Sequence, residues 1–373
     1  MKKGKILKKE EGLTVVRLEG SPYEMGYQHG KALRNEIKYF ASNLKHLFAR
    51  YEGILGKLAF PIFRFASKIL EKNIPKEFRE EMRGISDSAG VDYNSIRLEN
   101  LTEELGKIFY SYLKPFIPFK CSCFVTKNAD GKIIWGRNLD YLFYEVLPGV
   151  NIVFVYVPQN GFPFISLAWP GVISAPTGIS RDFNLILLSS STNSRLFNGI
   201  PQGILTRQVI QYSQSLEDGL RKIISLSATI GQNLVLVSKN DAKVIEVSPR
   251  KKAIRSFRDQ AITVTNHFQI KEMEKEQVSP IAPRSIPDEF FSLFFTLEGS
   301  KKRAEKMKMA LSKSQGIDID PKRAMEILDQ VAGPGTIQSV VCIPQKEEFW
   351  VAKRSQPPVT KGEWLHLSID DLL

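Results

Sequence analysis

The fold of this chain is decided by the stretch Cys121-Ser122-Cys123-Phe124-Val125 and its continuation Gly136-Arg137-Asn138-Leu139-Asp140-Tyr141. Between them, Asn128-Ala129-Asp130-Gly131 has the composition of a tight turn, and β-branched and aromatic residues flank it. We therefore predict a hairpin that returns Arg137 and Asp140 to the start of the first strand, beside Cys121. Because a nearby cation favours a thiolate and a carboxylate can orient a proton acceptor, this hairpin predicts a cysteine nucleophile.

Cys123 is a second candidate nucleophile, since residues two apart on a strand face the same way. Alternatively, both thiols are small buried residues of a core strand, which is the usual position of a free cysteine. The arginine and aspartate of the return strand favour the catalytic interpretation. Cys342 lies in an apolar strand pattern and is expected in the core.

The hairpin resembles the N-terminal nucleophile (Ntn) hydrolases of the acid ceramidase, choloylglycine hydrolase and isopenicillin-N acyltransferase group. Their mature enzymes begin with Cys-Ser/Thr and continue into Gly-Arg-Asn-hydrophobic-Asp-aromatic. Arg137 lies 16 positions and Asp140 19 positions after Cys121, which is the spacing of those families and selects Cys121 over Cys123. The resemblance extends from about Gly20 to Lys353 through three further motifs, Gly20–Gly30, Thr265–Phe268 and Thr336–Val340.

The resemblance implies that the precursor cleaves itself between Lys120 and Cys121. The new α-amino group of Cys121 would then be the general base for its own thiol. Asp140 would hold that amino group, and Arg137 would stabilise negative charge near the thiol and the substrate carbonyl. Asn266 would donate to the oxyanion through its side-chain amide. Without the resemblance, an Asp–Arg pair at a hairpin end is a surface ion pair and an Asn at a strand end is a turn former.

Two more site assignments follow from the resemblance. Arg284, within Pro283-Arg284-Ser285, is matched to a distal arginine, with a solvated surface arginine as the alternative. A second oxyanion donor is expected from a backbone N–H near Gly178-Ile179-Ser180, where relatives often carry Asn in place of Ser180.

The histidines indicate neither a Cys–His pair nor a metal site. The chain has four, and none lies in a recognisable Cys–His hydrolase context: His29, His46, His267 and His366. An α-amino group titrates near pH 8, so it can serve as the base without histidine. No metal-ligand cluster forms with the cysteines, and we expect no zinc and no cofactor.

The composition, 43% hydrophobic and 25% charged, is that of a soluble globular protein. Three cysteines do not make a disulfide framework, which suits a reducing compartment. The first residues lack an apolar h-region and no long apolar run follows, so we expect no secretory signal, no transmembrane helix and a cytoplasmic protein. The net charge of +12 is spread along the chain without a nucleic-acid-binding motif, so we expect no nucleic-acid partner.

The pattern divides the chain at Cys121. Residues 1–120 are predicted to be a mostly helical pro-segment, the α-subunit after self-cleavage, with helices at Glu24–Tyr51, Ile54–Leu70 (interrupted at Pro61) and Pro75–Gly90 and a break at Lys114–Lys120. Residues 121–373 are predicted to be the catalytic β-subunit, with strands at Gly149–Val157, Phe164–Trp169, Phe183–Leu188, Asn233–Val237, Lys243–Val247, Ala261–Thr265, Ile337–Ile343 and Phe349–Ala352. Helices are expected there at Ile204–Tyr212, Leu216–Ser225, Phe290–Lys313 and Pro321–Val331. Periodicity gives the class α+β, and the resemblance implies a four-layer αββα sandwich whose two subunits stay associated.

Residues 43–72 are both apolar and basic. A helix packed on the catalytic domain is the preferred interpretation, and an interfacial helix that collects lipid substrates from a bilayer is the alternative.

The function implied is a self-processing cysteine hydrolase or acyltransferase that cleaves a linear, non-peptide amide through an acyl-Cys121 intermediate. An N-acyl lipid amide is one candidate substrate, and the acyl chain, the amine and the acceptor stay open. The alternatives are a phospholipase B-like ester hydrolase and a catalytically idle relative that serves as a binding protein.

Overall fold

The computed structural model describes residues 4–52, 54–113, 119–141, 147, 151–190, 192, 196–257, 261–279, 296–313 and 318–373. Its strands are β1 (Lys5–Glu10), β2 (Leu13–Gly20), β3 (Phe119–Lys127), β4 (Ile133–Tyr141), β5 (Asn151–Pro158), β6 (Phe164–Ala168), β7 (Thr177–Ile179), β8 (Phe183–Ser189), β9 (Gln232–Ser238), β10 (Ala242–Val247), β11 (Lys252–Ser256), β12 (Ile262–Val264), β13 (Thr336–Ile343), β14 (Glu348–Lys353) and β15 (Glu363–Ser368). Its helices are α1 (Pro22–Ala32), α2 (Arg34–Glu52), α3 (Ile54–Glu71), α4 (Lys76–Ala89), α5 (Tyr93–Leu113), α6 (Gln202–Tyr212), α7 (Leu216–Ser225), α8 (Lys271–Glu274), α10 (Leu297–Lys313), α11 (Pro321–Gln330) and α12 (Ile369–Leu372), with single 3-10 turns η2 (Pro344–Lys346) and η3 (Val359–Lys361).

The strands form two sheets that lie against each other. The larger has the order β1-β2-β5-β6-β7-β8-β9-β10-β11, and the smaller has the order β12-β3-β4-β13-β14-β15. β3 of the smaller sheet contacts β8 of the larger one. Apolar side chains of both sheets are buried between them, because each sheet must cover one hydrophobic face. The predicted α+β class with packed sheets is confirmed.

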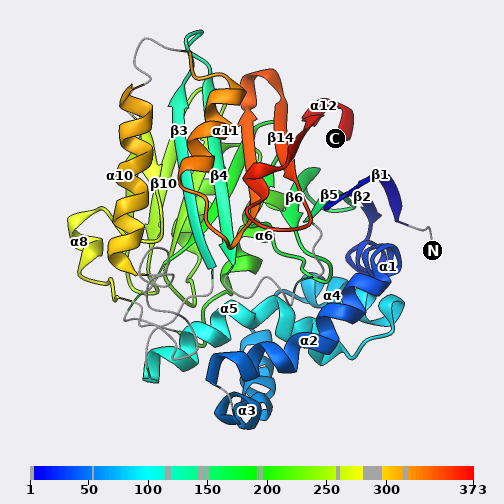
Figure 1. Ribbon diagram of the computed structural model, residues 1–373. Helices are drawn as coiled ribbons and strands as arrows, with labels where there is room; N and C mark the ends of the chain where they lie inside the picture. Colours follow the sequence, from blue (N-terminus) through cyan, green and yellow to red (C-terminus); the bar gives the residue numbers. More distant parts are fainter. Residues whose placement is uncertain are drawn as a thin grey trace.

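Helices cover the outer faces of the sheet pair. α10 and α11 pack on β3, β4, β12 and β13, and Figure 1 shows them in front of that sheet. α6 and α7 pack on β7, β8 and β9 of the other sheet. The N-terminal helices α1–α5 lie together at one end of both sheets (Figure 1).

Residues before Cys121 also contribute to the larger sheet, which was not predicted. β1 and β2 form its edge, and β2 pairs in parallel with β5 from Leu13 opposite Asn151 to Gly20 opposite Pro158. Two strands from the start of the chain therefore share a sheet with strands that follow Cys121. β1 was not predicted because its alternation is short and strongly basic, Lys5-Ile6-Leu7-Lys8-Lys9.

The predicted N-terminal helices form with altered limits. The segment Glu24–Tyr51 divides at Leu33 into α1 and α2, and a capping box between Ser21 and Glu24 starts α1. The interruption expected at Pro61 is wrong, since α3 continues through it. α4 ends where expected, at Gly90, whose φ of +69° is a left-handed conformation that glycine adopts readily.

α5 was not predicted at all. Its buried positions include Arg97, Glu99, Glu104 and Lys107, and these charges hide the apolar stripe that reveals a packed helix. The break expected at Lys114–Lys120 is wrong at its end, because Phe119 and Lys120 already belong to β3; residues 114–118 lie outside the described part. After Cys121 the predicted strands and helices are present with small shifts in their limits. Residues 149–150 and 290–295 of these predictions lie outside the described part. Five elements of this region were not predicted, namely β7, β11, β15, α8 and α12.

Candidate active site

The predicted hairpin forms as β3 and β4. At its turn the Asn128 N–H donates to the Lys132 carbonyl at 2.9 Å and the Gly131 N–H to the Asn128 carbonyl at 3.0 Å. Gly131 has φ +74°, a region in which glycine carries no steric cost. The register places Cys121 opposite Leu139 and Lys120 opposite Asp140. The local turn chemistry thus brings the return strand back to the cysteine.

Cys121 and Arg137 form the centre of the candidate site. Arg137 Nη2 donates to Cys121 Sγ at 3.5 Å, and both side chains are buried. The guanidinium is held by the Leu187 carbonyl at 3.2 Å and by the Thr177 hydroxyl. Burial raises the pKa of the Cys121 thiol, and the Arg137 charge opposes that rise. The thiol therefore needs a base to remove its proton. The Arg137 guanidinium would then stabilise the thiolate.

Cys123 lies on the same strand but does not line the cavity described below. It is fully buried, and burial raises its pKa to about 12. Cys342 is likewise buried in β13. Among the three thiols, Cys121 alone borders the cavity.

Asp140 is 2% exposed and lies opposite Lys120 on the neighbouring strand. Its Oδ1 accepts from the Thr336 hydroxyl, whereas Oδ2 has no hydrogen-bond partner among the described residues. Burial raises its pKa to about 6, against the opposing charges of Arg303 and Arg137. One oxygen of Asp140 is thus available as an acceptor beside the Lys120–Cys121 bond.

Asn266 lies in the site, two residues after the end of β12. Its Oδ1 accepts from the backbone N–H of Cys121 at 2.9 Å, and its Nδ2 donates to the Ser189 carbonyl at 2.7 Å. In the continuous chain the amide oxygen, rather than Asp140, receives the Cys121 nitrogen. The second Nδ2 hydrogen is the one available to an oxyanion, so the predicted donor role of Asn266 stays a prediction.

The predicted second oxyanion donor is wrong. The Ser180 N–H donates to the Phe183 carbonyl at 3.1 Å, and Gly178 and Ile179 pair within the sheet. These residues close the turn between β7 and β8 and do not line the cavity. Arg284 lies outside the described residues, so the structure does not test its assignment.

Arg303 of α10 lies at the site and was not predicted from the sequence. It is 5% exposed, and it donates from Nη2 to Asn266 Oδ1 at 2.8 Å and from Nε to the Ser122 hydroxyl at 3.2 Å. With the Cys121 N–H as a second donor, it fixes the orientation of the Asn266 amide. Its sequence context, Lys301-Lys302-Arg303, is typical of a charged, solvent-exposed helix face. The signal that could have found Arg303 is its helical spacing with the buried residues Ser300, three positions before it, and Met307, four positions after it.

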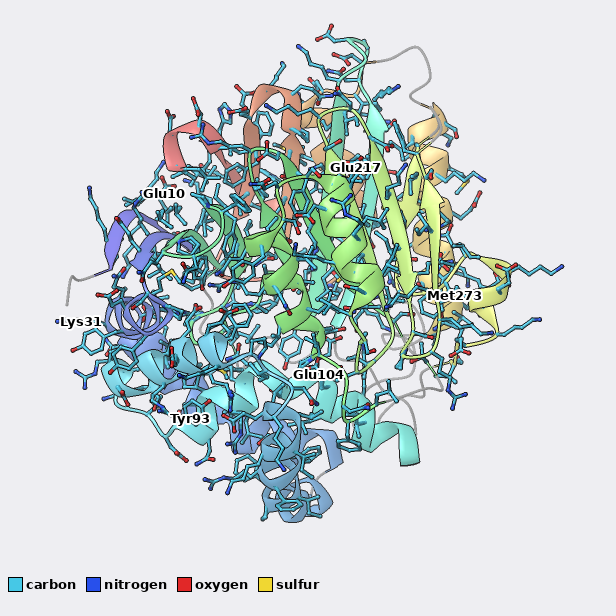
Figure 2. The ribbon with its side chains drawn as sticks, turned by 180° about the vertical axis from the view of Figure 1, so that it is seen from behind. Glu10, Lys31, Tyr93, Glu104, Glu217 and Met273 are labelled. Carbon is cyan, nitrogen blue, oxygen red and sulfur yellow. The ribbon has the colours of Figure 1, made fainter. Side chains whose placement is uncertain are left out.

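Cys121 faces a cavity with an empty volume of about 770 Å³, its open mouth included. The walls are mainly apolar and include Phe40, Leu139, Tyr141, Trp169, Val172 and Leu187. α5 contributes three carboxylates, Glu99, Glu103 and Glu104. Figure 2 shows Glu104 where the N-terminal helices meet the sheets. The segment before Cys121 therefore builds a wall of the site.

Neither His29 nor His267, the histidines that are buried in the described part of the chain, is suited to be the base that the thiol needs. Burial lowers the pKa of His29 to about 3 and that of His267 to about 4. His267 Nδ1 lies 2.9 Å from the Ser300 hydroxyl, which accepts from the Asn266 N–H, so this histidine supports the loop that carries Asn266. Within the described residues no group of three or more His, Cys, Asp or Glu side chains could hold a metal ion.

Comparison with known proteins gives a family match. The family model "Acyl-coenzyme A:6-aminopenicillanic acid acyl-transferase" matches residues 126–337. This range covers more than half of the chain and includes Arg137, Asp140 and Asn266, but it begins after Cys121.

Three relatives show the extent of the similarity. An "Uncharacterized protein" of Archaeoglobus fulgidus is 26% identical over 363 residues, which is 89% of this chain and 60% of that protein. The N-acylethanolamine-hydrolyzing acid amidase of Caenorhabditis elegans is 23% identical over 45% of this chain and 46% of its own. The beta-alanyl-dopamine/carcinine hydrolase of Drosophila melanogaster is 23% identical over 59% of each chain.

The chain thus spans 60% or less of the length of these relatives. A solved structure of the Caenorhabditis elegans amidase ortholog aligns with 60% of this chain and 93% of its own, at 17% identity and a TM-score of 0.45.

Proposed function

This chain belongs to the acyl-coenzyme A:6-aminopenicillanic acid acyl-transferase family of Ntn hydrolases, and we propose that it is a self-processing cysteine amidohydrolase or acyltransferase of linear, non-peptide amides. The observation that carries the proposal is the 3.5 Å contact between Arg137 Nη2 and Cys121 Sγ at a cavity. Two stacked sheets with helices on both outer faces are the layers of an αββα sandwich, and we assign the fold to the sandwich of these enzymes. The relatives named for amide hydrolysis support the same reaction class.

Self-processing would begin with attack of the Cys121 sulfur on the Lys120 carbonyl carbon. The carbon–nitrogen bond between Lys120 and Cys121 breaks and the nitrogen takes a proton, which leaves a thioester and frees the α-amino group of Cys121. Water then hydrolyses the thioester and releases the Lys120 carboxylate and the Cys121 thiol. That amino group replaces a peptide N–H whose present acceptor is Asn266 Oδ1 at 2.9 Å. The open Oδ2 of Asp140 provides a second acceptor for it. Two acceptors would fix the amine as the base that the buried thiol needs.

Amide cleavage would then use the same sulfur. The α-amine takes the thiol proton, and the thiolate attacks the substrate carbonyl. The positive charge of Arg137 stabilises the negative charge that develops in this step. The carbon–nitrogen bond breaks, and the α-ammonium returns the proton to the leaving amine. Water or a second amine then attacks the thioester and releases the acyl group. The amide protons of Asn266 are the proposed donors to the oxyanion.

A substrate comparison tests this function against the ester-hydrolase alternative. We expect turnover of an N-acylethanolamine to exceed that of a lysophospholipid of the same acyl chain by at least about tenfold in kcat/KM, a difference of about 1.4 kcal/mol in transition-state binding. Turnover of both substrates is measured by the release of the free fatty acid. Turnover of the ester alone would make the chain a phospholipase B-like enzyme. Turnover of neither, with ligand binding intact, would favour the idle binding relative.

A lipid substrate would be collected through α3, and we propose that its exposed face contacts bilayers. Ile62, Phe65 and Ile69 are 53%, 66% and 37% exposed at helical spacing, beside the basic Arg64 and Lys68. The opposite face packs on α2 and α5 through the buried Phe63, Ala66 and Leu70. The side chains of residues 45–59 are not described. No described helix has the length and apolarity needed to span a membrane.

Vesicle flotation tests the exposed face of α3. We expect the chain to float with vesicles containing anionic lipid, and Phe65→Glu to weaken binding at least about tenfold, because it removes a phenyl ring worth about 2 kcal/mol on burial and adds a negative charge. Ile254→Glu on β11, where Ile254 is 43% exposed, is the matched control. If the unmodified chain does not float with the vesicles, the proposed membrane contact is wrong.

A further inference from the structure

The cavity carries three carboxylates from α5, and two of them are satisfied within the protein. Glu103 accepts from the Ser189 hydroxyl and pairs with Lys107 Nζ at 3.1 Å. Glu104 Oε1 accepts from the Gln202 N–H at 2.6 Å, at the start of α6. These two residues join the helix that precedes Cys121 to elements that follow it. They need no ligand to account for them.

Glu99 differs from its two neighbours. It is 6% exposed and lines the cavity, yet neither of its carboxylate oxygens has a hydrogen-bond partner among the described residues. A buried carboxylate without a partner destabilises the folded state. Burial raises the pKa of Glu99 well above its usual range, and no neighbouring charge opposes this rise. The protein therefore holds an uncompensated acid in the wall of its candidate active site.

The loop beside Glu99 cannot supply the missing donors, because its N–H groups are already used. The Gly171 N–H donates to His29 Nε2 at 2.9 Å, and the Ile173 N–H donates to Asn100 Oδ1 at 2.9 Å. The N–H of Val172 donates to the Trp169 carbonyl at 3.1 Å. Every backbone donor from Gly171 to Ile173 thus points away from the carboxylate.

The same loop holds the Glu99 side chain in place. A Cβ atom on Gly171 would collide with Glu99 Oε2, and Gly171 has φ +89°, so the carboxylate packs directly against a glycine backbone. Asn100 Nδ2 also donates to the Gly171 carbonyl at 2.9 Å, which ties this loop to the same helix. The position of the carboxyl group is therefore fixed, while both of its oxygens lack a hydrogen-bond partner among the described residues.

We propose that Glu99 binds an ammonium group carried by the substrate, an inference that rests on the proposed amide cleavage at Cys121. A primary ammonium supplies up to three donors and a full positive charge to the two vacant oxygens. The apolar walls formed by Trp169, Val172 and Phe40 lower the local dielectric constant, which strengthens such a pair. The preferred substrates are then amides that carry an ammonium group on the amine or acyl part, and neutral amides of the same length are cleaved more slowly.

Glu99 and Cys121 line the same cavity, and a series of hydrogen bonds links Cys121 to the helix that carries Glu99. Asn266 accepts from the Cys121 N–H at 2.9 Å and donates to the Ser189 carbonyl at 2.7 Å. The Ser189 hydroxyl donates to Glu103, which lies one helical turn from Glu99. Four residues of α-helix advance about 6 Å along the axis, so a linker of a few methylene groups can join the scissile amide to the ammonium.

Matched substrates test the inference kinetically. Monoacylated diamines with two to five methylenes are compared with the N-alkyl amides of equal length, in which a methyl replaces the ammonium. We expect the best diamine to exceed its neutral counterpart at least about tenfold in kcat/KM, and Glu99→Gln to reduce that preference to within about twofold. Glu298→Gln removes an exposed carboxylate of α10 and is the matched control that keeps the preference. Equal turnover of both series by the unmodified chain overturns the inference while leaving amide cleavage standing.

A binding measurement separates failure of the inference from failure of the proposed function. Cys121→Ala protein is titrated calorimetrically with hexylammonium and with 1-hexanol, with and without the additional change Glu99→Gln. We expect hexylammonium to bind at least about tenfold more tightly than hexanol, and to lose that advantage with Glu99→Gln. Equal binding of the two probes, or binding of neither, overturns the inference whether or not any amide is hydrolysed.

Glu99→Met is a second variant, because it keeps the length of the side chain and removes both charge and hydrogen bonding. A role in folding alone would lower the unfolding midpoint of Glu99→Met. We expect the midpoint to stay equal or rise, since a buried acid without a partner is removed, together with the same loss of ammonium preference. A lower midpoint with an unchanged preference would assign Glu99 to stability and overturn the inference.

Discussion

Cys121→Ala is expected to leave the protein as one chain of 42.3 kDa and to abolish amide turnover. The unmodified chain is expected to give two fragments, residues 1–120 and 121–373. Both processing and turnover require the sulfur that lies 3.5 Å from Arg137 Nη2. Loss of a nucleophile of this kind lowers kcat by about three orders of magnitude or more. Intact mass spectrometry of the purified protein measures the first effect, and release of the acyl product measures the second.

Cys123→Ala is the matched control for this experiment. It removes a thiol from the same strand, two residues away, that is buried and does not line the cavity. We expect normal processing and nearly normal turnover from it. If the unmodified protein stays a single chain and still cleaves amides, the α-amine cannot be the base. If Cys121→Ala is still cut between Lys120 and Cys121, the sulfur is not the processing nucleophile.

The centre of the site was predictable because its information is local. Turn residues fix the hairpin register, and the register fixes which residues of the return strand lie beside Cys121. Arg137 follows directly from that register. Asn266 is distant in sequence and was found only through the resemblance to the Ntn families. Its contact with the Cys121 N–H depends on packing between strands that no local pattern specifies.

Some of the parts that were missed are those whose charges are buried. A charged residue in a sequence is ordinarily assigned to the surface, because an unpaired buried charge is costly. In α5 and α10 the charges of Glu99, Glu104 and Arg303 lie in the interior instead, facing the cavity or Asn266. In α5 these buried charges hide the apolar stripe by which a packed helix is recognised, whereas α10 was predicted as a helix and only the burial of Arg303 on it was missed. The donor expected near Ser180 failed for the opposite reason, because regular sheet and turn bonds already use those N–H groups.

A buried ion pair joins the segment before Cys121 to the rest of the protein. Arg207 of α6 donates from Nη2 to Glu81 Oε2 of α4 at 2.9 Å and from Nη1 to Glu81 Oε1 at 3.2 Å. Both side chains are at most 1% exposed, and the guanidinium lies 3.9 Å from the centre of the Tyr156 ring. The geometry is bidentate and stacked, which is the arrangement in which arginine binds a carboxylate best. Together with the parallel pairing of β2 and β5, it would hold the two products of self-cleavage together.

Glu81→Ala is therefore expected to destabilise the protein by about 3–5 kcal/mol, because it leaves the Arg207 charge buried without its partner. In processed protein it should also release residues 1–120 at a lower urea concentration, measured by size-exclusion chromatography in a urea series. Glu298→Ala, which removes an exposed ion pair with Lys302, should change stability by less than about 0.5 kcal/mol. Glu81→Met combined with Arg207→Met should recover part of the loss, since no buried charge then remains unpaired. A Glu81→Ala protein as stable as the unmodified chain, with its fragments still associated, would show that the strands and the cavity wall alone hold the two segments together.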